Sequence, residues 1–453
     1  GKAFPDIVRA FSGDFSAAPD AVAFPRDEAE VARVLAWCEA ETLAAVPFGG
    51  GTTVVGGVER QAGGAWRGAV AIDLRAMDRV LEIDPASRAA RIQAGATGPR
   101  LEEQLAAHGL TLRHYPQSFE HSTLGGWIVT RAGGHFATLY THIDDLLESV
   151  RMITPRGEFA TRRLPASGAG PSPDRLVLGS EGTLGVVTEA WMRVRPRPRF
   201  RASASARFAT FFEGARAARA IAQSGLYPSN CRLLDPQEAL LFGVPADGGA
   251  VLLLAFESAE QSMRAWIDRA LDIAVLYDGV SGGAKEKVDE RGADASAEAW
   301  RRAFFDAPYK QSALVSVGVI ADTFETACTW DRFEGLYERV RADVTAAMQR
   351  ACGGGIVTCR FSHVYPDGPA PYFSFVCAGR PGEEIAQWQV VKRAACDALE
   401  ASGATITHHH AVGRLHRPWY EREVPHLFID ALRAAKKAMD PAGIMNPGVL
   451  FDP

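Results

Sequence analysis

The sequence predicts an α+β protein of two or three domains, and three observations lead to this prediction. The chain has 453 residues, which is more than one ordinary core holds when a domain takes about 150 residues. Its 47% hydrophobic and 23% charged residues are typical of a globular protein. In the second half, helix-like stretches alternate with strand-like ones, which favours a sheet with helices on one face.

The first half is expected to begin with a strand that runs into a helix over residues 20–41. Asp27 is a candidate N-cap because Glu30 follows three residues later and the apolar residues beyond it keep helical spacing. Further along, the pattern predicts a glycine loop at residues 47–53, a helix at 98–109 and a long polar loop at 115–134. It also predicts two hairpin turns, at residues 84–87 and 154–157.

The second half follows a segment rich in Arg and Pro, residues 195–208, which has the composition of an extended connection between domains. Helices are predicted over residues 211–224, 260–273, 328–350 and 383–402. Strands are predicted over residues 249–258, 312–321, 355–366 and 372–378. A final helix is expected to end at Asp440, where a proline follows.

Composition excludes several classes of function. The net charge of -5, from 49 basic and 54 acidic residues, gives no field that would attract nucleic acid. The longest apolar runs are far shorter than the roughly 20 residues of a membrane span. Seven cysteines, with no CxxC pair, support neither a disulfide framework nor a zinc knuckle. We therefore expect a cytoplasmic protein.

Two glycine clusters and one polar stretch are candidates for binding a cofactor. "PFGGGTT" (47–53) follows a strand, as a phosphate-binding loop would, but it fits neither a P-loop nor a Rossmann fingerprint. "GSEGTLG" (179–185) places Ser180, Glu181 and Thr183 on a similarly permissive backbone. Each could be a simple turn. Together with residues 116–134 they favour wrapping a long cofactor over binding a compact one.

A histidine run, "THHHAVGRLH" (407–416), is the candidate for proton chemistry. Adjacent imidazoles titrate near neutrality and can move protons or stabilise a developing anion. The alternatives are a satisfied polar strand or a metal site. If the run is a strand, successive side chains point to opposite faces, so at most two of the three histidines share one ligand.

Several motifs together resemble one flavoenzyme family. "PFGGGTT", "PQSFEHSTLGGWIVTRAGG", "TPRG", "GSEGTLGVVTEA" and "DPAGIMNPGVLF" are similar to the FAD-binding family of vanillyl-alcohol oxidase and p-cresol methylhydroxylase. "PSNCRLLD", "TCRFSHVYPDGPAPYFSFV" and "HHHAVGRLHRPW" resemble its alkylglycerone-phosphate synthase branch, which exchanges the acyl chain of acyl-dihydroxyacetone phosphate for a fatty alcohol. The resemblance implies a two-subdomain FAD-binding domain (1–200), an α+β substrate domain with an antiparallel sheet covered by helices (201–405), and a C-terminal segment that returns to the FAD domain (406–453).

The resemblance also assigns roles to residues. It implies Tyr372, Arg232 and the run His408, His409 and His410 as catalytic, and Arg360 as the substrate-phosphate ligand. Neighbouring histidine or arginine side chains could lower the pKa of Tyr372 toward neutrality. The implied FAD contacts are Pro47, Phe48, Gly49, Gly50, Gly51, Thr52, Thr53, Pro116, Gln117, Ser118, Ser122, Thr123, Gly126, Thr130, Arg131, Gly133, Glu181, Gly182, Gly185, Val186 and Val187.

No metal is expected, because the metal-binding branch of the family carries a glutamate and a further histidine that this chain lacks. His363 remains, and a lone histidine is more often structural. FAD is expected to be dissociable: "PFGGGTT" has no histidine, and His114, His121 and His135 match no attachment site.

Departures from the branch concern the acyl-chain tunnel more than the flavin site. Gln117, His121 and Ser374 stand where the animal pattern has an acid, a phenylalanine and an aromatic residue. The expected partners are a lipid-like or other small-molecule substrate and a second copy of the chain as a homodimer, with room for peripheral membrane contact and no nucleic acid. The alternative function is an FAD-linked oxidase or dehydrogenase of a 2-hydroxy acid or alcohol.

Overall fold

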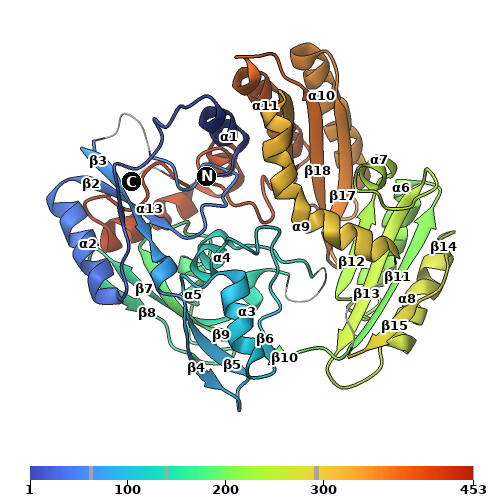
Figure 1. Ribbon diagram of the computed structural model, residues 1–453, viewed down its shortest axis with the longest axis horizontal. Helices are drawn as coiled ribbons and strands as arrows, with labels where there is room; N and C mark the ends of the chain where they lie inside the picture. Colours follow the sequence, from blue (N-terminus) through green and yellow to red (C-terminus); the bar gives the residue numbers. More distant parts are fainter. Residues whose placement is uncertain (61–64, 137, 139–140, 290–294, 452–453) are drawn as a thin grey trace. The chain divides into compact units, whose positions relative to one another are not determined.

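A computed structural model describes residues 1–60, 65–136, 138, 141–289 and 295–451 (Figure 1). The chain divides into two compact units. The first unit comprises Gly1–Gly133, His142–Pro196 and His409–Pro453, and the second comprises Gly134–Thr141 and Arg197–His408. The resemblance to the flavoenzyme family implied two main divisions, after residues 200 and 405. That division did not include the assignment of Gly134–Thr141 to the second unit.

The first unit contains three sheets. A parallel sheet has the order β1-β3-β2, an antiparallel sheet has the order β4-β5-β9-β7-β8, and β10 pairs with β6. The strands are β1 (Ala21–Ala23), β2 (Leu43–Phe48), β3 (Gly68–Asp73), β4 (Val80–Asp84), β5 (Ala89–Gln93), β6 (Leu110–Thr111), β7 (Leu147–Thr154), β8 (Gly157–Ala160), β9 (Val186–Arg193) and β10 (Arg195–Pro196). The helices are α1 (Phe4–Phe11), α2 (Glu28–Ala40), α3 (Gly98–Ala106), α4 (Leu124–Thr130), α5 (Asp174–Val177), α12 (Arg417–Glu423) and α13 (His426–Met439), with short 3-10 turns at Leu74–Ala76 and Ile143–Asp145.

Local capping chemistry explains where several of these helices begin and end. Asp27 is the N-cap of α2, and its carboxylate accepts the backbone N–H of Glu30 at 2.8 Å, as predicted. Helix α13 ends at Met439 with Asp440 as its C-cap, before the proline that cannot continue it. Both hairpins are confirmed as β4–β5 and β7–β8.

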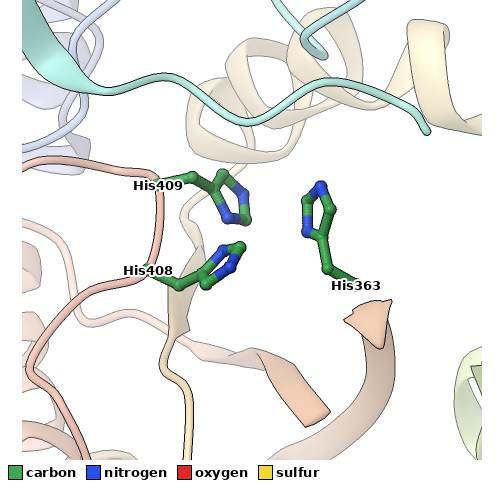
Figure 2. A group of neighbouring side chains, drawn as sticks. All are labelled: His363, His408 and His409. Atoms are coloured by element: carbon green, nitrogen blue, oxygen red, sulfur yellow. The ribbon is translucent and has the colours of Figure 1, made fainter. Parts of the chain in front are cut away.

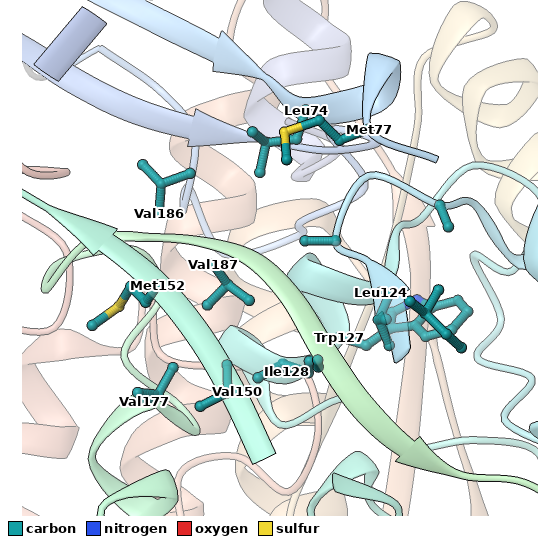
Figure 3. Close-up of a cluster of buried hydrophobic side chains, with 14 of the residues drawn as sticks. Leu74, Met77, Leu124, Trp127, Ile128, Val150, Met152, Val177, Val186 and Val187 are labelled. Atoms are coloured by element: carbon teal, nitrogen blue, oxygen red, sulfur yellow. The ribbon is translucent and has the colours of Figure 1, made fainter. Parts of the chain in front are cut away.

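The core of the first unit lies between the antiparallel sheet and its helices (Figure 3). Trp127 and Ile128 of α4 are 2% and 0% exposed and pack in one cluster with Val186 and Val187 of β9. Burial of such side chains stabilises the fold by roughly 1.5–3 kcal/mol each. The cluster fixes α4 against the sheet, and with it the segments at either end of α4.

The second unit is built on one antiparallel sheet, with the order β14-β11-β13-β12-β17-β18-β16 and β15 paired to β11. Its strands are β11 (Phe200–Phe208), β12 (Asn230–Leu234), β13 (Ala250–Ser258), β14 (Val280–Ser281), β15 (Lys285–Val288), β16 (Val319–Glu325), β17 (Ile356–Val364) and β18 (Pro369–Ala378). Its helices are α6 (Phe211–Ala222), α7 (Pro236–Leu241), α8 (Arg264–Val275), α9 (Ala295–Ser316), α10 (Phe333–Cys352) and α11 (Glu384–Ala401). The predicted α+β class is confirmed.

Helices contact both faces of this sheet, so the expectation of helices on one face is wrong. Phe361 of β17 meets Phe211 of α6 and Phe333 of α10, with ring centroids 5.5 and 4.8 Å away. The next residue toward the N-terminus, Arg360, points to the opposite face and pairs with Glu238 of α7. Helix α9 also packs against the sheet, where its Phe304 joins Leu234 in a buried cluster. The polar side chains of β17 and β18 therefore lie on the face that α7 contacts.

Three local predictions are wrong. Residues 115–134 are not all loop, because Leu124–Thr130 forms α4 around the buried Trp127. The supposed connection 195–208 includes β11, which pairs with β13 along its whole length. The predicted strand 312–321 begins inside α9, and the strand β16 starts only at Val319. In each case contacts distant in the sequence outweigh local composition.

Candidate active site

A row of functional side chains crosses the sheet of the second unit. Arg360 of β17 is the register partner of Tyr372 of β18, and Tyr372 is the partner of Glu325 of β16. Partners in an antiparallel sheet project to the same face, so the three side chains lie side by side. They are 3%, 4% and 1% exposed, and solvent therefore screens their interactions little.

Arg360 is held from two directions. Its Nη1 donates to Oε1 of Glu238, which is 0% exposed. Its guanidinium carbon lies 3.7 Å from the centroid of the Tyr372 ring, within cation–π range. Glu238 also accepts the hydroxyl of Thr358. The structure thus gives Arg360 a carboxylate partner and an aromatic partner within its own unit.

Burial raises the pKa of Tyr372, while the positive charge of Arg360 and a hydrogen bond to Thr323 act in the opposite direction. The phenol donates this bond to Oγ1 of Thr323 at 3.0 Å. The expectation that neighbouring charges bring the pKa of this tyrosine below its ordinary value is therefore wrong, because desolvation is the larger effect. At neutral pH Tyr372 is protonated.

Arg232 of β12 is 1% exposed, and its placement depends on an irregularity in β17. The register shifts between Phe361 and His363, a β-bulge that leaves Ser362 outside the pairing with β18. The backbone carbonyl of Ser362 then accepts Nη2 of Arg232 at 3.2 Å. Burial and the neighbouring Arg360 lower the pKa of Arg232 to about 9.

His408 is also tied to this row of residues. Oε2 of Glu325 accepts its backbone N–H at 2.7 Å, and Oε1 accepts the hydroxyl of Thr407 at 2.6 Å. The imidazole Nε2 lies 2.7 Å from the hydroxyl of Tyr365. One carboxylate, Glu325, thus positions the start of the histidine run beside Tyr372.

His363 lies beside His408, and their ring centroids are 4.8 Å apart (Figure 2). The two nitrogens of His363 lie 3.1 Å from the hydroxyl of Ser362 and 3.0 Å from the carbonyl of Gly134. Its ring is therefore fixed by protein groups, as a structural histidine would be. The expected absence of a metal stays a prediction.

His409 and His410 belong to the first unit, where their rings meet edge to face at 4.8 Å. The run from 408 to 410 is a bend, not a strand, so the alternation expected of a strand does not apply. Just beyond it, Glu181 accepts the backbone N–H groups of Val412 and Gly413 at 2.9 Å each. Burial raises the pKa of Glu181 to about 7 although these bonds and Arg414 oppose the shift.

The three segments predicted to bind FAD meet in the first unit. A Cβ on Gly49 would lie 2.1 Å from Oγ1 of Thr123, and one on Gly50 would lie 1.9 Å from the carbonyl of His121. Gly182, with φ +74°, would place a Cβ 2.9 Å from Pro47. Only glycine allows backbone segments to approach this closely. The residues 47–53, 116–133 and 181–187 therefore form one cluster of loops.

Buried polar atoms in this unit fit a bound cofactor. His114 is 1% exposed, and neither of its ring nitrogens has a hydrogen-bond partner in the described part of the chain. The hydroxyl of Ser180, 4% exposed, likewise lacks one among the described residues. Buried groups of this kind normally bond to protein, water or a ligand. Together with the glycine loops they are compatible with a polar, extended group such as FAD.

Several of the other predicted FAD contacts have structural roles. Arg131 caps α4 with φ +51° and pairs with Asp144 at 2.8 Å. Ser122 accepts Nε1 of Trp127 at 2.7 Å, and Thr130 donates to the carbonyl of Gly126. Gly133 bridges His142, and Gly185 sits against Met152. The side chains of Val186 and Val187 are in the core, so only their backbones are candidates for contact with a ligand.

Sequence reasoning missed three acidic residues. Glu238 and Glu325 hold Arg360 and His408, and Asp235, the N-cap of α7, accepts the backbone N–H groups of Glu238 and Cys359 at 2.7 Å each. Burial raises the pKa of Asp235 to about 6. "DPQE" at 235–238 has the form of a helix N-terminus, and that signal would have found Asp235. Nothing in the sequence indicates which arginine Glu238 meets.

Comparisons with known proteins agree with the geometry. Residues 19–162 match the FAD binding domain family, and residues 197–450 match the family of FAD linked oxidases, C-terminal domain. Alkyldihydroxyacetonephosphate synthase of Dictyostelium discoideum is 31% identical over 469 residues, which span 100% of this chain and 76% of that protein.

Two solved structures extend the comparison. One of an alkyldihydroxyacetonephosphate synthase superposes with a TM-score of 0.82 at 28% identity, covering 99% of this chain and 80% of the other. One of p-cresol methylhydroxylase with substrate bound, at 15% identity and covering 96% and 90%, has a TM-score of 0.75 and shows the shared fold. FAD is the cofactor of the domain that the first unit carries. The chain therefore belongs to the FAD-linked oxidase family, and it is similar over its whole length to alkyldihydroxyacetonephosphate synthase.

Proposed function

We propose that this protein exchanges the acyl group of an acyl-dihydroxyacetone phosphate for a fatty alcohol, which forms an ether lipid precursor and releases a fatty acid. The observation that carries the proposal is the buried row of Arg360, Tyr372 and Glu325 in one sheet register. The similarity to alkyldihydroxyacetonephosphate synthases supports the substrate class. The carbon–oxygen bond to the carboxylate breaks, the bond to the alcohol oxygen forms, and no net oxidation occurs.

Tyr372 moves the proton in this proposal. A carbon next to a ketone must lose and regain a proton during the exchange, and the phenol of Tyr372 is the group that carries it. The phenol is protonated at neutral pH and hydrogen-bonded to Thr323. It gives up its proton most easily while Arg360 lies over its ring, because a cation favours the phenolate. His408 beside Tyr365 is positioned to pass protons onward.

The cofactor and the second unit have separate tasks. When bound, FAD would supply an electrophilic ring system for the exchange. The loops that contain Gly49, Gly50 and Gly182 would hold the FAD. Ser180 and His114 supply buried polar atoms in the same unit. Orientation of the phosphate is assigned to basic residues of the second unit, with Arg232 as a candidate.

A radiochemical assay tests the proposal. The FAD-bound protein is mixed with palmitoyl-dihydroxyacetone phosphate and labelled hexadecanol, and we expect labelled ether product and released palmitate in equal amounts. Protein that binds flavin and forms no labelled ether contradicts the proposal. Anaerobic bleaching of the flavin by a 2-hydroxy acid would instead identify an FAD-linked dehydrogenase.

We further infer a cytoplasmic homodimer that acts on lipid-like substrates and contacts membranes only peripherally. Seven free cysteines support a reducing compartment. No helix among the described residues is long and apolar enough to cross a bilayer. Sedimentation equilibrium measures the oligomeric state, and vesicle flotation with the dimer measures lipid contact.

A further inference from the structure

Glu238, Arg360 and Tyr372 form a continuous line of buried groups from α7 through β17 to β18. Glu238 is 0% exposed, Arg360 is 3% exposed and Tyr372 is 4% exposed. Nη1 of Arg360 donates to Glu238, and the guanidinium carbon lies 3.7 Å from the tyrosine ring centroid. The same guanidinium is thus shared between a carboxylate and a phenol.

The carboxylate itself is held in place. Glu238 accepts the hydroxyl of Thr358, which is two residues before Arg360 on the same strand. The backbone N–H of Glu238 donates to Oδ1 of Asp235 at 2.7 Å, which fixes the first turn of α7. Asp235 in turn accepts the backbone N–H of Cys359. Helix α7 is therefore attached to β17 on both sides of the Arg360 contact.

This arrangement decides between two roles for Arg360. To grip a substrate phosphate, the guanidinium would need open donors, but Arg360 is 3% exposed, its Nη1 is bonded to Glu238, and its guanidinium carbon lies 3.7 Å from the centroid of the Tyr372 ring. To assist Tyr372, it has only to stay where it is. We propose that Glu238 and Arg360 form a positioning pair for Tyr372, in which the carboxylate holds the guanidinium over the phenol ring, and that Arg360 serves this tyrosine and not the substrate phosphate.

The other charged groups near Tyr372 act differently. Glu325 and Asp322 of β16 oppose loss of the phenol proton, and Thr323 and Arg360 favour it. Arg232 of β12 and Glu238 of α7 are further ionisable groups near this row, and Lys392 of α11 donates to the backbone carbonyl of Thr323 at 2.6 Å. Arg360 is the largest of the favourable influences. If Arg360 loses its position over the ring, the pKa of Tyr372 should therefore rise.

The test is a titration that needs no substrate. A fluorinated tyrosine placed at position 372 of the FAD-bound protein has a more acidic phenol, and its ionisation is followed by fluorine NMR. Arg360→Met is expected to raise the pH of half-ionisation by about one unit, because the phenolate loses its cation. Glu238→Gln, which keeps the size of the side chain, is expected to raise it as well, by a smaller amount.

A double-mutant cycle separates positioning from direct charge. If Glu238 acts through Arg360, Glu238→Gln has no further effect in the Arg360→Met background. A downward shift with Glu238→Gln would mean that the carboxylate acts on the phenol by its own charge, and an equal shift in both backgrounds would mean that it does not act through Arg360; either result would overturn the proposal. The double variant carries no unpaired buried charge, so it remains informative if either single variant folds poorly.

Kinetics give a second readout. The inference uses the proposed function only in taking Tyr372 as the proton carrier, and the titration stands even if no ether lipid is formed. In the exchange assay, Arg360→Met is expected to lower kcat at least tenfold with little change in KM for the phosphate substrate. A raised KM with unchanged kcat would mean that Arg360 binds the substrate phosphate, which contradicts the proposal. Leu271→Ala on α8 is the matched control, because it loosens the core of the same unit and should leave the titration unchanged.

Discussion

The two units create polar sites in opposite ways. The first unit uses its main chain: Gly49 and Gly50 bring backbone segments together where a single Cβ would collide with Thr123 or His121. The second unit uses ionised side chains, with Arg360 and Glu238 buried in contact. The comparison teaches that the first site is sensitive to added volume and the second to removed charge. Four predictions test it, in order of decreasing effect.

Gly50→Ala is expected to have the largest effect. The added Cβ would lie 1.9 Å from the carbonyl oxygen of His121, which is a backbone atom and not the end of a flexible side chain. We expect loss of bound flavin and a severe loss of folded protein, measured by flavin absorbance and thermal unfolding. Gly168→Ala is the control, since nothing lies within 4 Å of its Cβ position. Normal flavin content in Gly50→Ala would show that volume is not limiting in this loop.

Tyr372→Phe should separate chemistry from folding in the second unit. The ring remains under Arg360, and only the hydroxyl bonded to Thr323 is lost. We expect the exchange rate to fall roughly 100- to 10,000-fold, while stability falls by only about 1 kcal/mol. Both are measured on flavin-loaded protein. An unchanged rate would remove Tyr372 from the reaction.

Two buried lysines, one in each unit, provide a matched pair. Lys436 donates to Asp440 and to the carbonyls of Thr183 and Met445. Lys436→Met removes the cation from these three acceptors and should lower the free energy of unfolding by about 3–5 kcal/mol.

Lys392 has fewer partners, since it donates only to Asp322 at 3.2 Å and to the backbone carbonyl of Thr323 at 2.6 Å among the described residues. We expect Lys392→Met to cost about 2 kcal/mol. Chemical denaturation compares the two variants. Equal losses would mean that the number of partners left behind does not decide the cost.

Glu181 should make stability depend on pH. Burial raises its pKa from 4.5 to about 7, so between these values the folded protein holds a proton that the unfolded chain has released. Its stabilising contribution is complete below pH 4.5 and is lost as the pH rises through about 7, up to roughly 3 kcal/mol. Glu181→Gln should flatten the unfolding free energy in this window. If the unfolding free energy of the variant falls with pH as steeply as that of the parent, the pH dependence comes from other groups, such as Asp235.

Local chemistry made much of the fold predictable. The cap at Asp27, the hairpins, and the strand that became β13 each depend on residues close in the sequence. The glycine loops were recognised because glycine has few other reasons to cluster. Helix α9 was missed because its apolar residues lack a clear helical period and a proline, Pro308, lies within it.

The site was only half predictable, because its geometry depends on strand register. Arg360 and Tyr372 were proposed from motifs, but their contact follows from a pairing between β17 and β18 that no local pattern specifies. Glu325 comes from a segment with no recognisable motif, and the helix N-terminus pattern that includes Glu238 does not indicate which arginine it meets. Burial also reversed the expected direction for the pKa of Tyr372, and burial is a property of the folded sheet.

The histidine run joins two anchored ends. On one side Glu325 fixes Thr407 and His408, and on the other Glu181 fixes Val412 and Gly413. Only residues 409–411 remain between the two clamps, so the backbone that carries His409 and His410 is held by a buried carboxylate at each end. Two of the three imidazoles therefore stand on a short stretch of backbone whose freedom is limited by its two fixed ends.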